Sequence, residues 1–215
     1  MPATPDAFDQ STYQVRLEWG IEGLARLAPA DVIVVVDVLR FSTTVIESVE
    51  RGADFPLDAA ARAISINGAA VAEAAAARGS LVLLGALRNA SAVADAVLAE
   101  QQRRGGRTSI AVIAAGELTG TDAGATVRFA VEDQLGAGAI IDALGALGID
   151  HTSPDAAVAA ESFRALRRAV KHLLTASGSG LELIAHGQRD EVLAAAAVDA
   201  ASVVPVLRDG VFRAV

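Results

Sequence analysis

The chain has 215 residues, which is enough for one domain with a substantial core, or for two small lobes that share a core. Hydrophobic residues make up 53% and charged residues 20%, a composition that excludes a disordered chain. The absence of cysteine excludes a disulfide framework, a zinc ribbon, an iron–sulfur site and a thiol nucleophile. A net charge of −8 argues against nonspecific binding to nucleic acid or to an anionic membrane.

The sequence shows no sign of membrane insertion or secretion. Its apolar runs are much shorter than the roughly 18 residues that a membrane span needs. The first residues, Met-Pro-Ala-Thr-Pro-Asp, lack the basic and apolar regions of a signal peptide. We therefore expect a cytoplasmic protein with no membrane partner.

The predicted elements begin after residue 11. Alternation of apolar and polar residues over 13–19 predicts a half-buried strand, and 20–27 predicts a short helix. The continuous β-branched run over 32–36 is typical of a strand that is buried on both faces. A helix is expected to follow and to end near Glu50.

The strand and helix unit then recurs. We expect strands at 64–66, 81–84 and 110–114. Helices should follow them, the first ending near 79, the second over about 90–103 and the third over about 127–147. Further helices are predicted over 154–176, 181–185 and 189–197, before a closing hairpin over 202–215. This alternation predicts a three-layer α/β/α fold around a largely parallel or mixed sheet, with residues 1–215 in a single domain or in two intimately packed lobes.

Polar side chains follow the predicted strands, and they are Asp37, Arg40, Asn67, Arg88, Asn89 and Glu117. Because the carboxyl ends of parallel strands lie at one edge of a sheet, we expect these groups to surround a ligand crevice. Ser42, Thr43 and Thr44 begin a helix there, where backbone amides and the helix dipole favour an anion. The set predicts an anion site with room for a hard cation.

Each of these residues also has a structural interpretation. Asp37 is a candidate metal ligand or general base, and the alternative is a carboxylate that caps a helix or pairs with an arginine. Leu39 stands where a haloacid-dehalogenase phosphatase has a second aspartate, which excludes the aspartyl-phosphate mechanism of that class. Arg40 and Arg88 are candidate grips for a phosphate or a sulfonate, or else members of structural ion pairs.

Glu132 and Asp133 lie in an apolar helical segment. Adjacent residues are 100° apart on a helix, so we expect one carboxylate to face the site and the other to cap or pair. The alternative is a solvated acidic step. Gly136 and Gly138 indicate close backbone packing, because each glycine costs the helix roughly 1 kcal/mol relative to alanine.

Common catalytic motifs are absent. The segment 178–180 is interpreted as a loop and lacks the third glycine of a dinucleotide fingerprint. The chain has no Walker A sequence and no nucleophile elbow. The three histidines, His151, His172 and His186, do not show a metal-ligand spacing.

An ordered set of motifs resembles the 2-phosphosulfolactate phosphatase family over about residues 12–210. The set comprises Glu18-Trp19-Gly20, the segment from Val34 to Thr44, Asn67-Gly68, the segment from Gly85 to Ala94, Ala114-Ala-Gly116-Glu117, and Glu132-Asp133-Gln-Leu-Gly-Ala-Gly138. Members of that family hydrolyse the phosphate ester of 2-phosphosulfolactate with magnesium, a step of the archaeal route to coenzyme M.

The resemblance implies a role for each candidate residue. Asp37, Glu132 and Asp133 would be catalytic, and Asp37 and Glu132 would hold Mg²⁺. A small anionic phosphorylated substrate would be bound by Arg40, Ser42, Thr43, Thr44, Asn67, Gly68, Arg88, Asn89 and Glu117. A homodimer is also expected, because two-fold oligomers are the commonest kind.

One departure from the family is large. Its members carry a long segment, with Gly-Glu and Asn-Ser-Pro elements, between the first helix and the Asn-Gly pair. Here residues 53–65, about one short strand and one helix, replace it. The sequence therefore leaves two alternatives open: a noncatalytic anion-binding or regulatory protein on a degenerate phosphatase scaffold, and a hydrolase or isomerase of small acidic metabolites.

Overall fold

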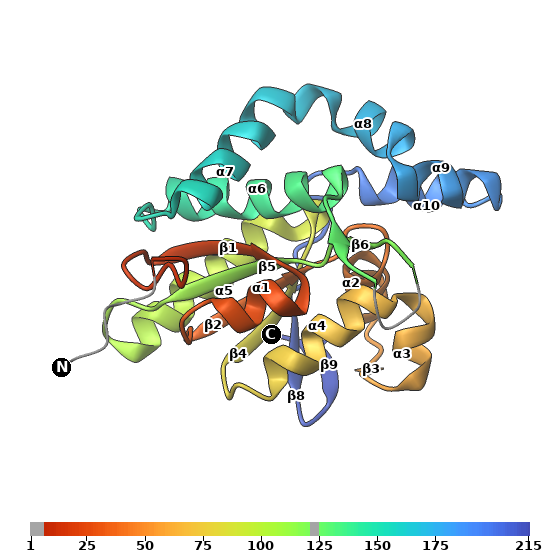
Figure 1. Cartoon of the computed structure of the whole chain (residues 1–215). Helices are drawn as coiled ribbons and strands as arrows, with labels where there is room; N and C mark the ends of the chain where they lie inside the picture. Colours follow the sequence, from red (N-terminus) through yellow and green to blue (C-terminus); the bar gives the residue numbers. More distant parts are fainter. Residues whose placement is uncertain (1–6, 121–124) are drawn as a thin grey trace.

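A mixed sheet organises the molecule. The computed structural model describes residues 7–120 and 125–215. Seven strands lie in the order β1-β5-β2-β4-β8-β9-β3 (Figure 1). Four neighbours are parallel, and they are β1 (Val15–Trp19), β5 (Ile110–Ala114), β2 (Val32–Val36) and β4 (Leu81–Gly85). Antiparallel pairs add β8 (Pro205–Arg208), β9 (Val211–Ala214) and β3 (Phe55–Pro56).

Helices cover both faces of this sheet (Figure 1). One face carries α5 (Ala90–Arg104), α6 (Val131–Ala146) and α7 (Pro154–Leu166), and the other carries α1 (Gly20–Arg26), α2 (Phe41–Glu50) and α4 (Ile66–Ala76). Successive side chains of a strand point to opposite faces of the sheet, so β2 contributes to the cores on both faces. Val34 and Val36 join the core under α5 and α6, whereas Ile33 and Val35 join the core under α2 and α4. The predicted three-layer α/β/α fold is confirmed.

Three short helices extend beyond the sheet after α7 (Figure 1). A 3₁₀ turn at Arg167–Ala169 (η2) separates α7 from α8 (Val170–Ala176), so the single helix predicted over 154–176 is wrong. The next helix, α9 (Gly178–Ala185), begins earlier than predicted because Ser177 Oγ accepts a hydrogen bond from Gly180 N at 3.1 Å. The last is α10 (Arg189–Ala195). Within the described ranges, no helix combines the length and apolar character that a bilayer crossing requires.

The strand predicted at 64–66 is wrong. Residue 64 ends α3 (Ala59–Ile64), and α4 starts at residue 66. Ser65 separates the two helices and caps α4, since its Oγ accepts a hydrogen bond from Gly68 N at 3.0 Å. Asn67 and Gly68 therefore lie in the first turn of a helix rather than in a turn after a strand.

The helix predicted from 127 also starts later. Val127–Arg128 forms a short strand, β7, that pairs with β6 (Glu117–Leu118) in a separate two-stranded sheet. Because Val127 and Arg128 pair with β6, α6 begins only at Val131. The closing hairpin is present, with its first strand at residue 205 rather than 202.

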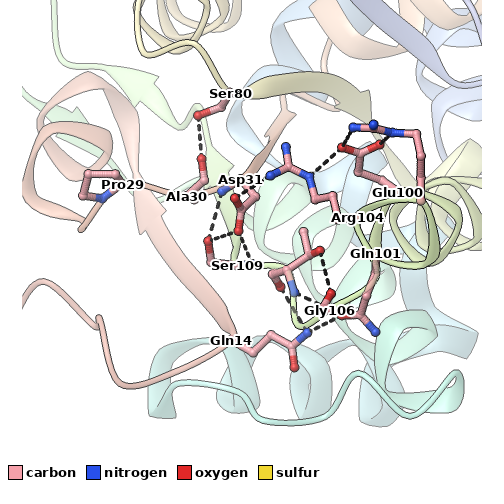
Figure 2. A network of polar contacts seen from close by, with 12 residues as sticks. Gln14, Pro29, Ala30, Asp31, Ser80, Glu100, Gln101, Arg104, Gly106 and Ser109 are labelled. Carbon is pink, nitrogen blue, oxygen red and sulfur yellow. Dashed lines mark hydrogen bonds and ion pairs between the residues drawn. The ribbon is translucent and has the colours of Figure 1, made fainter.

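A polar network holds the amino ends of the strands together (Figure 2). Asp31, just before β2, accepts hydrogen bonds from Ser109 N at 2.8 Å and Ser109 Oγ at 2.7 Å, and pairs with Arg104 at 2.7 Å. Gln14, just before β1, donates to Gln101 Oε1 at 2.7 Å. These contacts join β1, β2, β5 and α5 at one sheet edge, and the residues that follow the strands lie at the opposite edge.

Candidate active site

A pocket of about 450 Å³ opens beyond the carboxyl ends of β2 and β5. Four segments line it: the loop after β2, the α3–α4 junction, the segment after β5, and α9. Figure 1 shows α9 at the same end of the molecule as α2, α3 and β6. The lining residues that the argument uses are Asp37, Arg40, Ser65, Asn67, Glu117 and Ser179. The structure thus brings together four of the residues that the strand-end rule selected.

Asp37 is buried at the base of this pocket, with 4% of its surface exposed. Its Oδ1 accepts a hydrogen bond from Phe41 N at 3.1 Å, and its Oδ2 accepts one from Ser65 Oγ at 2.5 Å. Burial raises the pKa of Asp37 to about 6, with a further rise from the charge of Glu117, although the hydrogen bonds lower it. Asp37 therefore both caps the start of α2 and lines the pocket.

Gly68 allows α4 to pack directly on Asp37. A Cβ built on Gly68 would lie 2.8 Å from Asp37 Cβ and 2.9 Å from Phe41 Cβ. Only glycine fits at this distance without displacing the carboxylate. Beside it, Asn67 Nδ2 donates to Gly116 O at 2.6 Å and thereby ties α4 to the segment after β5.

Asp133 fixes the loops around Asp37. It is 3% exposed, and its Oδ1 accepts from Val38 N at 2.7 Å while its Oδ2 accepts from Gly116 N at 2.8 Å. Burial raises its pKa well above the usual value, and the charges of Asp37 and Glu132 raise it further. One buried carboxyl group therefore joins the segments that follow β2 and β5.

Glu117, Ser179 and Glu132 form an acidic cluster at one side of the pocket. Ser179 Oγ lies 2.6 Å from Glu117 Oε1 and is also hydrogen-bonded to Glu132 Oε1. A hydroxyl carries one hydrogen, so it can donate to only one of these carboxylates at a time. Burial raises the pKa of Glu117, and the charge of Glu132 raises it further.

Glu132 does not line the main pocket. It is 2% exposed and lines an adjoining cavity of about 150 Å³, together with Glu117 and Ser179. Its Oε2 has no hydrogen-bond partner among the residues that the structure describes. Because Glu132 and Asp133 are both buried, the alternative of a solvated acidic step is wrong.

Arg40 supplies the positive charge at the pocket wall. Its Nη1 lies 3.1 Å from Glu191 Oε2 on α10, and both side chains are partly exposed. His186 also lines the pocket, and its Nδ1 lies 2.9 Å from Glu182 O.

The structure does not bring Arg88 and Asn89 to this pocket. Arg88 donates to Ala194 O at 2.8 Å and lies 3.7 Å from Glu50 and 3.9 Å from Glu47. Asn89 is buried; its Nδ2 donates to the carbonyl of residue 203 at 3.1 Å and its Oδ1 accepts from the amide of residue 86 at 2.9 Å. Both side chains hold the end of β4 to α2, α10 and the C-terminal segment.

The hydroxyls at the start of α2 are also engaged with the backbone. Ser42 is fully buried, and its Oγ accepts from Asp37 N at 3.1 Å. Thr43 donates to Val38 O at 2.8 Å, and Thr44 donates to Arg40 O at 2.9 Å. The two threonines line a side pocket of about 330 Å³ next to the main one.

Sequence reasoning missed Ser65, Ser179, Glu182 and His186, all of which line the main pocket. Ser65 carried a readable signal, because a serine before an alanine-rich segment is a typical helix N-cap. No local pattern indicates a role for Ser179, since its partners Glu117 and Glu132 are 62 and 47 residues away in the sequence.

The site fits a hard divalent cation. Carboxylate oxygens are the ligands that Mg²⁺ prefers, and Mg²⁺ is commonly held by one or two carboxylates together with water and substrate phosphate. Here Asp37 and Glu117 line one pocket, and Glu132, whose buried Oε2 has no hydrogen-bond partner among the described residues, lines the adjoining cavity. Across residues 7–120 and 125–215, no three acidic or histidine side chains already form a metal-binding group. The carboxylates that line these hollows are thus of a type that Mg²⁺ accepts, and among the described residues they do not form a complete ligand set.

A comparison with known families identifies the scaffold. The family model described as 2-phosphosulpholactate phosphatase matches residues 59–210, which is well over half of the chain. The match includes α3, α4, Glu117, both carboxylates of α6 and the helices that cover the pocket. It begins within the connection that follows α2, so Asp37 and Arg40 precede it. The chain belongs to the 2-phosphosulpholactate phosphatase family.

Proposed function

We propose that this protein is a magnesium-dependent phosphatase that hydrolyses a small acidic phosphomonoester. The observation that carries the proposal is the buried Asp37, which faces a 450 Å³ pocket that Glu117 and Arg40 also line. The pocket lies at the carboxyl ends of parallel strands, where α/β proteins bind their ligands. Family membership supports phosphate ester hydrolysis as the reaction.

Asp37 and Glu117 would hold the metal ion, and Glu132, which lines the adjoining cavity beside Glu117, is a further candidate ligand. When bound, Mg²⁺ polarises the phosphoryl oxygens and lowers the pKa of a bound water. The ion would also neutralise charge that the chain leaves unbalanced. Among the described residues that line the main pocket, Arg40 is the one arginine or lysine, whereas Asp37, Glu117 and Glu182 are acidic.

The remaining residues position the reacting groups. Ser65 orients the Asp37 carboxylate through its 2.5 Å hydrogen bond, and Asp133 fixes the two loops from behind. Arg40 binds an anionic group of the substrate as a charged hydrogen-bond donor. Catalysis then depends chiefly on positioning and on electrostatic stabilisation of the phosphoryl group.

The shortened connection still forms a wall of the pocket. Residues 63 and 64 of α3, with residues 65 and 66 at the start of α4, all line it. This supports the enzymatic hypothesis over the degenerate scaffold, because residues of the connection itself contribute to the pocket.

The test is phosphate release from 2-phosphosulfolactate and from a panel of small phosphomonoesters, measured with Mg²⁺ and again with excess chelator. We expect turnover that chelator abolishes and renewed Mg²⁺ restores. Anion binding without turnover of any ester by folded, Mg²⁺-loaded protein would contradict the proposal and would support the noncatalytic alternative.

A further inference from the structure

Arg40 stands between two hollows. It lines the main pocket and also the side pocket of about 330 Å³, and Leu39 and Ile64 line both as well. Among the described residues that line either hollow, Arg40 is the one arginine or lysine. Residues 121–124 add no basic side chain to the sequence. The proposed function places the phosphoryl group at Asp37 and Glu117. A second acidic group of a ligand in either of these two hollows therefore has Arg40 as its arginine partner, whereas Arg128 lines the adjoining hollows beside Glu117.

Arg40 is already paired in the protein. Its Nη1 lies 3.1 Å from Glu191 Oε2, on the first turn of α10, and the other oxygen of Glu191 accepts from Gln188 Nε2 at 2.8 Å. The side chains of Arg40 and Glu191 are 32% and 52% exposed. Ion pairs of such exposure are weak and exchange readily with other anions.

The other carboxylate of the side pocket is differently placed. Glu47 lies 3.9 Å from Arg88, and Arg88 also pairs with Glu50 and donates to Ala194 O. Glu191, by contrast, directs its charge at the same guanidinium that a substrate would need.

Resting on the proposed function, we propose that Glu191 occupies the anion-binding position of Arg40 in the substrate-free protein, and that a second acidic group of the substrate displaces it. Glu191 is then a specificity-determining residue. A phosphomonoester with a carboxylate or sulfonate exchanges one anion for another at Arg40. An ester without a second acidic group has only its phosphoryl group, which the proposed function places at Asp37 and Glu117, so it leaves the pair of Arg40 and Glu191 intact.

The test is the charge-removing variant Glu191→Gln, which keeps the size of the side chain and its ability to accept from Gln188. Sulfoacetate is the probe, because it carries a sulfonate and a carboxylate and its binding needs no turnover. We expect its calorimetric Kd to fall about threefold to fivefold, the range in which an exposed ion pair competes. Asp190→Asn, one residue earlier and exposed, removes the same charge from α10 and should leave the Kd unchanged.

A kinetic comparison locates the effect at Arg40. In Glu191→Gln the KM for 2-phosphoglycolate should fall by a similar factor, while the KM for ethyl phosphate, which lacks a second acidic group, and both kcat values should stay the same. In the background of Arg40→Gln, the Glu191 substitution should change neither Kd nor KM, because the competition no longer exists.

The outcomes separate the two proposals. Unchanged or weaker sulfoacetate binding by Glu191→Gln, or no binding by either protein, overturns the role of Glu191 even if the esters are hydrolysed. Tighter binding by Glu191→Gln, without hydrolysis of any ester by the wild type, upholds the role of Glu191 and overturns the phosphatase.

Discussion

Replacement of Asp37 with asparagine should make the protein more stable above neutral pH. Asp37 is buried and its pKa in the folded protein is raised to about 6 from 3.8, chiefly by burial. The folded state therefore holds a proton that the unfolded state releases between these pH values. Stability from this group is fully present below pH 3.8 and is lost as the pH rises through 6.

The magnitude follows from the same two values. The rise from 3.8 to about 6 spans about 2.2 pH units, and 1.36 kcal/mol for each gives about 3 kcal/mol of lost stability at pH 8. Asparagine carries no charge, so Asp37→Asn avoids this loss. The variant weakens the contact with Ser65 by about 1 kcal/mol, because an amide group replaces the carboxyl group as its partner. We expect a net gain of about 2 kcal/mol at pH 8 and a net loss of about 1 kcal/mol at pH 4.

The assay is urea unfolding of wild type and variant in metal-free buffer at pH 4, 6 and 8. The difference between the two unfolding free energies should change by about 3 kcal/mol in favour of the variant across this range. Asp190→Asn, which removes an exposed aspartate, should show no such trend. A difference that is flat with pH, or that favours the wild type at pH 8, would refute the claim that Asp37 is held in a charge-disfavouring site.

Three further predictions concern packing, hydrogen bonding and metal. In α6, Gly138→Ala should lower the free energy of unfolding by about 1–3 kcal/mol, because the added Cβ would overlap Ala159 O. Gly145→Ala should raise it by up to about 1 kcal/mol, because a Cβ there has nothing within 4 Å. Urea unfolding of both variants tests the two expectations. Ser65→Ala removes a hydrogen bond that lowers the pKa of Asp37, so the acid limb of the pH–rate profile should move to higher pH, and an unmoved limb would speak against the positioning role. Mg²⁺ should raise the thermal midpoint of the wild type and not that of Asp37→Asn, as followed by calorimetry with and without chelator.

The parts of the fold that could be predicted are those with a local signal. The β-branched run at 32–36 has one structural solution, a strand buried on both faces, and α2 follows it directly. The segment 64–66 misled because short apolar runs fit a strand or a helix equally well. The segment is helical instead, because Ser65 caps α4 directly after the end of α3. At Val127, antiparallel pairing with Leu118 overrode the helical pattern, because the apolar spacing of a helix does not report strand pairing.

The candidate site also contains residues that the sequence could predict and residues that it could not. Asp37 and Glu117 could be found because they follow parallel strands, and the topology carries both to one edge. The same rule does not say where a side chain points. Arg88 also follows a strand, yet its guanidinium turns to Ala194 O and the carboxylates of α2. Ser179 and Glu191 reach the site from the C-terminal helices, and only the packing of those helices over the sheet edge brings them there.

The central claim is that Asp37 forms the reacting site of a magnesium-dependent phosphatase. Its most direct test is the rate of phosphate release from 2-phosphosulfolactate by wild type and by Asp37→Asn, each with saturating Mg²⁺ and each shown to be folded. We expect wild-type turnover that chelator abolishes, and a loss of at least a hundredfold in the variant, on the scale of removing a general base or a metal ligand. Equal turnover by the two proteins would contradict the account.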